Sequence, residues 1–93
     1  MIRSFADRHT KAVFEDVPVK GFGADLRRSA RKKLLMLDRS ANLTDLRVPP
    51  GNRLEALKGD RAGQHSIRIN NQWRLCFVWR EGDAYEVEMT DYH

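Results

Sequence analysis

The sequence has 93 residues, 41% of them hydrophobic and 32% charged, and its formal net charge at pH 7 is +4. This length allows one domain with a single modest core. The one cysteine excludes an internal disulfide and is typical of a cytoplasmic protein, and no apolar run is long enough to span a membrane. Because the three histidines are scattered, we expect neither a metal nor a cofactor. The positive charge favours a polyanionic partner, above all nucleic acid.

The amino-terminal part of the chain predicts a strand and then a short helix. Residues 1–5 are short and mixed apolar, which is compatible with a strand that begins the sheet. Asp7 is a suitable N-cap for a helix that extends to about Asp16. A proline and two glycines within residues 18–23 end that helix.

Residues 24–38 give the clearest helical pattern in the sequence. Its apolar residues fall on one stripe: Leu26, Ala30, Leu34 and Leu37. The opposite side is basic and contains no acidic residue: Arg27, Arg28, Arg31 and Lys32. A solvated amphipathic helix and a polyanion-binding helix both fit this pattern, and the absence of an acidic residue favours the second. Leu35 and Met36 lie off the stripe, so either the first helix or a partner protein is expected to cover them.

The middle of the chain predicts little regular structure. Residues 42–53 contain Pro49-Pro50-Gly51 and leave room for a single turn near residues 44–46. A short strand follows over residues 54–57. Residues 58–63, with two glycines and mixed charges, are typical of a mobile loop.

The last third of the chain, residues 65–93, predicts a three-stranded antiparallel meander, because apolar residues alternate in three runs. The runs are Ile67 and Ile69; Trp73, Leu75, Phe77 and Trp79; and Tyr85, Val87 and Met89. For these residues to share one face, each hairpin loop must hold three residues, 70–72 in the first and 81–83 in the second.

This register gathers polar residues on the other face of the sheet. Arg68 lies opposite Arg74, with Thr90 beside Arg74 and Tyr92 one step further. Two like charges in such a pair cost about 0.2–1 kcal/mol. The arginines therefore either point into water or form a binding site for an anionic and planar ligand, such as a phosphate together with its nucleobase. Cys76 shares this face and is expected to pack under a covering element. The whole chain is predicted to be an α+β sandwich with two helices on one face of an antiparallel sheet and this polar face open.

Four segments of the sequence resemble a known family. MIRSF, PPGNRLEALKGDRAGQHSIRINNQWRLCF, GDAY and the terminal DYH are similar, in order and spacing, to the HigB (host inhibition of growth) killer toxins of the RelE superfamily. The resemblance covers the full chain as one domain, residues 1–93. It implies the microbial RNase fold and a ribosome-dependent endoribonuclease that cuts mRNA in the decoding site and inhibits translation. It also implies a cognate helix-turn-helix antitoxin, HigA-like, whose complex with the toxin binds operator DNA.

The resemblance also assigns candidate catalytic residues. Two are strand arginines, one is a loop lysine and three form the carboxy-terminal motif: Arg68, Arg74, Lys58, Asp91, Tyr92 and His93. Many relatives have a histidine where this chain has Glu55. Metal-free RNA cleavage needs a base for the ribose 2′-OH, cations around the phosphorane and an acid for the leaving oxygen.

The arginines and the lysine suit the cationic role in that chemistry. His93 can exchange a proton near neutral pH, and Tyr92 can stack on a base or donate its proton. Glu55 either replaces the missing histidine as base or weakens catalysis by adding negative charge. Two other functions use the same basic face: a non-catalytic module that binds RNA or the ribosome, and a co-repressor that touches DNA through its antitoxin.

Overall fold

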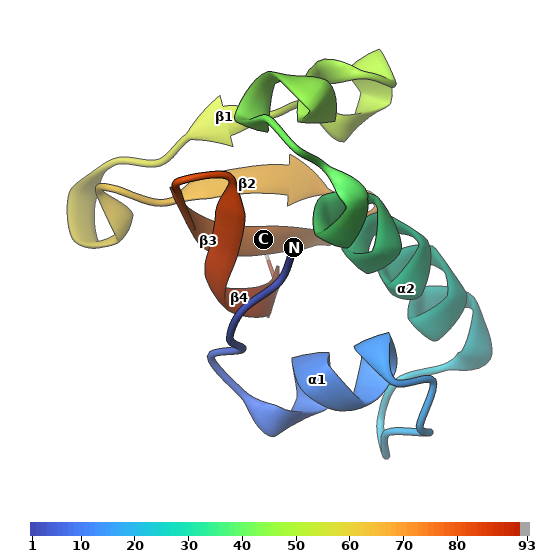
Figure 1. The fold of residues 1–93 in the computed structure, drawn as a ribbon. Helices are drawn as coiled ribbons and strands as arrows, with labels where there is room; N and C mark the ends of the chain where they lie inside the picture. Colours follow the sequence, from blue (N-terminus) through green and yellow to red (C-terminus); the bar gives the residue numbers. More distant parts are fainter. Residues whose placement is uncertain (92–93) are drawn as a thin grey trace.

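The computed structural model describes residues 1–91 as a two-layer α+β domain, as predicted. Its helices are α1 (Arg8–Phe14) and α2 (Ala24–Arg39), and its strands are β1 (Glu55–Ala56), β2 (His65–Arg68), β3 (Trp73–Arg80) and β4 (Asp83–Asp91). The strands form one antiparallel sheet in the order β1-β2-β3-β4. Three 3-10 turns complete the fold: Leu43–Arg47, Pro50–Asn52 and Gly59–Arg61. In Figure 1, α1 and α2 pack against each other, and β1 lies at the edge of the sheet far from α1.

Helix α1 begins at the predicted cap. The Asp7 carboxylate accepts a hydrogen bond from the Thr10 amide at 2.7 Å, which satisfies one of the amides left open at a helix start. Thr10 is fully buried, and its hydroxyl accepts a hydrogen bond from the Met89 amide of β4 at 3.0 Å. This threonine, which was not predicted from the sequence, joins the helix to the sheet.

Helix α2 presents the predicted apolar stripe to the core. Ala30, Leu34 and Leu37 are fully buried and pack with Ile67, Leu75, Phe77 and Val87 of the sheet. Met36 also packs against this core, whereas Leu35 stays half-buried at the surface. The turn predicted near residues 44–46 is present as the 3-10 turn Leu43–Arg47. Within residues 1–91, no helix is long and apolar enough to cross a membrane.

The predicted amino-terminal strand is wrong. Residues 1–5 make two isolated parallel bridges to β4, Ile2 with Ala84 and Phe5 with Val87. Between the bridges, the Glu86 amide donates to the Ser4 hydroxyl at 2.9 Å and not to a backbone carbonyl. Since β4 is irregular at this point, a continuous ladder cannot form.

The second predicted hairpin loop is also wrong. It holds two residues, Glu81 and Gly82, both with positive φ (49° and 84°), and Trp79 lies opposite Ala84. Such a two-residue turn matches the twist of the flanking strands. It would leave Val87 on the wrong face, but a β-bulge in β4, with Glu86 at φ 52°, restores the alternation. Tyr85 therefore leaves the core face, and the centroid of its ring lies 4.5 Å from the guanidinium carbon of Arg80.

Candidate functional site

The arginine pair predicted from the sheet register is present. Arg68 of β2 lies opposite Arg74 of β3, and the loop between them holds residues 70–72 as expected. The Asn70 carboxamide oxygen closes this loop by accepting from the amides of Gln72 and Trp73, both at 2.8 Å. This side-chain-capped turn fixes the two arginines relative to each other.

A surface pocket of about 340 Å³ surrounds this pair, and we call it the arginine pocket. Among the described residues, three arginines and one glutamate line it. Its lining residues are Arg53, Glu55, Arg68, Asn70, Asn71, Gln72 and Arg74. Such an excess of planar cationic donors over acceptors suits a phosphate-bearing ligand.

Arg74 is held in place from three directions. Its Nε donates to the Ser66 hydroxyl at 2.9 Å, and its Nη2 donates to the Arg53 carbonyl at 2.7 Å and lies 3.4 Å from Glu55 Oε1. Only 12% of the Arg74 side chain is exposed. A guanidinium restrained in this way loses little freedom when an anion binds, which is the arrangement that electrostatic stabilisation of a transition state requires.

The polar face of the sheet is therefore less open than the sequence predicts. Ser66 and Cys76 are both fully buried, and the Arg74 side chain extends over Ser66. The predicted packing role of Cys76 is confirmed by its burial.

A buried asparagine anchors the loop that carries Arg53. Asn52 is fully buried and donates to the Leu46 carbonyl at 3.1 Å, while its own side-chain oxygen accepts from Lys33 Nζ at 2.5 Å. Arg53 follows directly in the left-handed conformation, with φ 47° and ψ 55°, and its carbonyl faces Arg74. Neither Ser66 nor Arg53 was predicted as a site residue from the sequence. Ser66 could have been predicted, because the alternation that places Arg74 on the polar face also places Ser66 there.

The structure brings two of the remaining predicted site residues, Glu55 and Asp91, to this pocket or its rim. Glu55 lies in it, but Lys58 is exposed in the following loop and does not line it. Asp91 pairs with Trp73 and accepts from Gln72 Nε2 at 3.0 Å, so it reaches the rim. Tyr92 and His93 lie outside the described residues.

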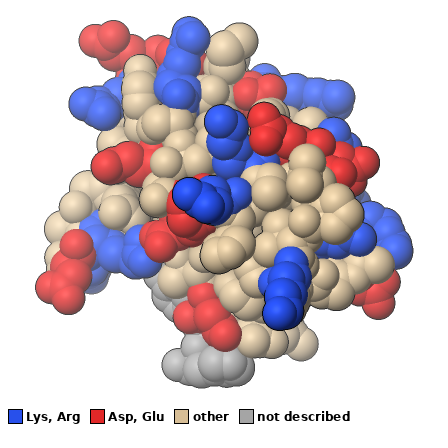
Figure 2. All heavy atoms as spheres, turned by 90° about the horizontal axis from the view of Figure 1, so that it is seen from below, with Lys and Arg blue, Asp and Glu red and all other residues tan. Residues whose placement is uncertain are grey.

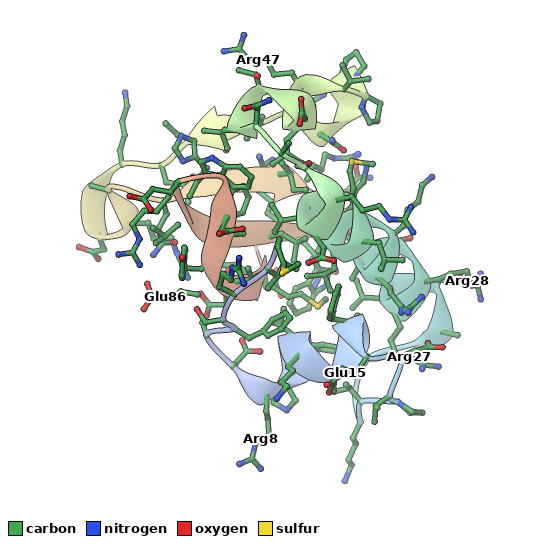
Figure 3. All side chains as sticks on the ribbon, in the orientation of Figure 1. Arg8, Glu15, Arg27, Arg28, Arg47 and Glu86 are labelled. Atoms are coloured by element: carbon green, nitrogen blue, oxygen red, sulfur yellow. The ribbon has the colours of Figure 1, made fainter. Side chains whose placement is uncertain are left out.

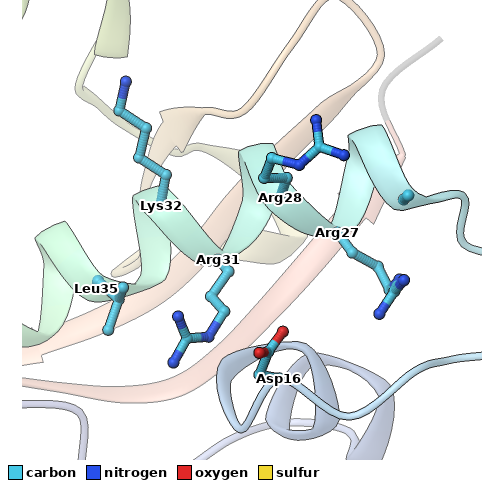
Figure 4. A pocket seen from close by; sticks show the side chains of 7 residues that line it. Asp16, Arg27, Arg28, Arg31, Lys32 and Leu35 are labelled. Atoms are coloured by element: carbon cyan, nitrogen blue, oxygen red, sulfur yellow. The ribbon is translucent and has the colours of Figure 1, made fainter.

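The basic residues of α2 line a second groove, of about 450 Å³, between α2 and the end of α1. No acidic residue was predicted beside these four, but Asp16 lines the same groove. In Figure 4, Arg27 and Arg31 extend from α2 on the side where Asp16 lies, and Lys32 extends on the opposite side. Arg28 pairs with Asp25 at 3.3 Å, and Arg31 donates to the Phe14 carbonyl at 3.2 Å. Leu35 also lines this groove, so α1 does not cover it completely. Two of the four cations are thus partly engaged within the chain.

On the face shown in Figure 2, basic and acidic side chains are interspersed. This face therefore offers a polyanion no general basic surface.

The sequence and structure are similar to those of toxins of toxin–antitoxin systems. Residues 3–93 match the family described as RelE-like toxin of type II toxin-antitoxin system HigB. Endoribonuclease HigB of Proteus vulgaris is 33% identical over the whole of both chains. Toxin HigB-1 of Vibrio cholerae is 51% identical over 53 residues, which span 57% of this chain and only 56% of that protein.

A solved structure shows the same fold at low sequence identity. The YoeB-YefM complex from Staphylococcus aureus matches with a TM-score of 0.63 and 16% identity, over 100% of this chain and 98% of that chain. This likeness, under 25% identity, concerns the fold alone. The full-length sequence match is the stronger observation, and from it the chain belongs to the HigB-like family of RelE-like type II toxins.

Proposed function

We propose that this chain is a toxin that cleaves mRNA on the ribosome and thereby inhibits translation and growth. The observation that carries the proposal is the arginine pocket, in which Arg68 and Arg74 lie opposite each other beside Glu55. It occurs in a chain aligned end to end with a relative named as an endoribonuclease. Two arginines side by side on neighbouring strands of one pocket offer the planar donors that suit a phosphodiester.

The chemistry proposed for this pocket needs no metal ion, because guanidinium groups supply the positive charge. Arg74, fixed by Ser66, stabilises the negative charge that develops on the phosphorane, and Arg68 binds the same phosphate from the neighbouring strand. Glu55 is the proposed general base for the ribose 2′-OH, since it is the only carboxylate among the residues of the range 1–91 that line the pocket. Its contact with Arg74 holds it beside the phosphate position.

The proposal extends to the residues around the pocket. Lys58 supplies a further cation from its loop, and Asp91 holds the rim through Gln72. His93 is the proposed acid for the leaving 5′ oxygen, and Tyr92 stacks on a base.

The proposed partners follow from membership of a type II family. A helix-turn-helix antitoxin, HigA-like, neutralises the toxin in the cytoplasm, and their complex binds operator DNA. Arg27, Arg28, Arg31 and Lys32 of α2 contact ribosomal RNA through its phosphates, which adds affinity without sequence selection.

The test is expression of the chain without an antitoxin. Growth is expected to slow, and mapped 5′ ends are expected to show new cuts in translated messages, which disappear when translation initiation is blocked. Arg74→Lys serves as the control, because it keeps the charge and loses the planar fork of donors. Unchanged growth and unchanged 5′ ends at confirmed soluble expression would instead support a non-catalytic RNA-binding module.

A further inference from the structure

We propose that Arg53 is an additional RNA-binding residue, whose guanidinium binds a substrate phosphate at the mouth of the arginine pocket. The inference rests on the proposed function and adds a residue to its substrate site. Arg53 lies in a segment that resembles the family, but neither the strand register nor the resemblance assigns it a role. It precedes β1 and comes to the pocket through the fold.

The three arginines of the pocket differ in how far their donors are already used. Arg74 donates to Ser66 and to the Arg53 carbonyl, and Arg68 donates to the Asn71 side chain. The Arg53 side chain is exposed and makes no hydrogen bond or ion pair with any other residue in the described range 1–91. The exposed guanidinium of a residue that lines a pocket, with its donors unused, has the capacity to bind an incoming anion bidentately.

The backbone of Arg53 strengthens this inference. Its left-handed conformation, φ 47° and ψ 55°, is strained for an L-residue with a long side chain, and glycine would adopt it without strain. The conformation is useful because it directs the Arg53 carbonyl to Arg74 Nη2 at 2.7 Å. Glycine would serve that backbone role equally well, so the arginine side chain itself is left without a structural function among the described residues.

The electrostatic surroundings point the same way. Burial, and after it the charges of Lys32 and Arg68, lower the pKa of Lys33 below its ordinary value of 10.5, so Lys33 adds a further positive charge within reach of Arg68. Lys33 donates to Asn52, the residue directly before Arg53. An excess of positive charge around a pocket with one carboxylate is relieved by a bound polyanion.

The left-handed position allows an unusually clean test. Arg53→Gly removes the guanidinium and keeps the carbonyl bond to Arg74, while Arg53→Lys keeps the charge. Arg47→Ala is the matched control, because Arg47 is exposed and projects away from the sheet in Figure 3, and its loss lowers the net charge equally. The probe is a non-cleavable 2′-O-methyl RNA oligonucleotide of mixed sequence, measured from 50 to 200 mM salt.

Arg53→Gly is expected to weaken binding about tenfold and to reduce the slope of log affinity against log salt by about one. Arg53→Lys is expected to restore the slope, and Arg47→Ala to leave both quantities unchanged. The thermal midpoint of Arg53→Gly is expected to match the wild type; if this variant is unstable, Arg53→Asn replaces it, since asparagine tolerates the same conformation.

The proposal is overturned if the wild type shows no salt-dependent binding, or if Arg53→Gly has an unchanged slope. A wild type that binds this RNA with the expected Arg53 dependence but cleaves no mRNA would refute the proposed function alone.

Discussion

Replacing Arg74 with alanine tests both the architecture and the chemistry of the arginine pocket. The change removes the donors to the Ser66 hydroxyl and the Arg53 carbonyl, and the contact with Glu55. The sequence alone predicts a nearly neutral effect on stability, because Arg74 alternates away from the core. The structure predicts otherwise, since only 12% of this side chain is exposed.

The loss of stability can be estimated from the groups that Arg74→Ala leaves without a donor. The Ser66 hydroxyl lies in a fully buried residue, and an unsatisfied buried polar group costs about 1–3 kcal/mol. For a domain of this size each kcal/mol lowers the thermal midpoint by about 4–8 °C. The ion pair adds little, because 55% of the Glu55 side chain is exposed.

The effect on cleavage should exceed the effect on folding. Removal of one donor from a preorganised anion site costs on the order of 10²–10³ in rate. Arg74→Lys separates the two effects. The lysine ammonium can donate to either the Ser66 hydroxyl or the Arg53 carbonyl, but it cannot donate to both in the planar geometry of a guanidinium. We expect Arg74→Lys to keep most of the stability and lose most of the activity.

The assay is single-turnover cleavage of a short message in a programmed ribosome, with thermal unfolding of each variant measured alongside. A folded Arg74→Ala that cleaves at the wild-type rate would mean that the active face has been misplaced. A fully active Arg74→Lys would show that the planar fork is unnecessary. If Arg74→Ala does not fold, Arg74→Lys still decides the question.

Two further predictions concern charge elsewhere in the chain. Glutamine at all four basic α2 positions (27, 28, 31 and 32) should weaken ribosome binding and flatten its salt dependence. If glutamine at Arg8, Lys11, Lys20 and Arg47 weakens ribosome binding equally, α2 has no special role in binding and is an ordinary solvated helix. The hydrogen bond from Arg3 and the amino group of Met1 lower the pKa of Asp83 below 3.8. Asp83 therefore stabilises the folded state above pH 3.8, and this stabilisation is lost as the pH falls through the folded-state pKa of Asp83. Asp83→Asn should therefore unfold at a lower temperature than the wild type at neutral pH, with the difference vanishing in acid; a constant difference across pH 2–6 would contradict this ion pair.

The first hairpin was predictable because its register depends on local information. Alternation from Ile67 to Phe77 and an asparagine-rich loop leave one pairing that buries the apolar side chains. The second hairpin was not, since a two-residue turn and a bulge at Glu86 each shift the alternation by one residue. Their effects cancel at Val87 and Met89, so the sequence predicts these residues correctly in the core for the wrong reason.

The site was predictable in part for the same reason. Arg68 and Arg74 face each other across one hairpin, and alternation finds such a pair. The Arg53 carbonyl accepts a hydrogen bond from Arg74, 21 residues further along the chain. This contact depends on the left-handed conformation of Arg53 and on the buried asparagine before it, and no periodic pattern predicts either feature. Asp16 similarly enters the α2 groove from the turn that follows α1. Contacts made between elements decide which charges in this chain are already satisfied, and a one-dimensional pattern does not contain them.

Glu55 occupies the position where many relatives have histidine, and its role decides how this pocket begins catalysis. Glu55→Gln is nearly isosteric and removes only the charge, so a base role predicts a fall in single-turnover rate of about 10²–10⁴. RNA binding should not weaken, because the lost charge lies 3.4 Å from Arg74 and repels phosphate. Glu55→His should recover part of the rate, with activity declining below about pH 6.5 as the new imidazole is protonated. A faster Glu55→Gln, or tighter RNA binding at an unchanged rate, would show that Glu55 only competes with phosphate for Arg74 and that the proton acceptor lies elsewhere.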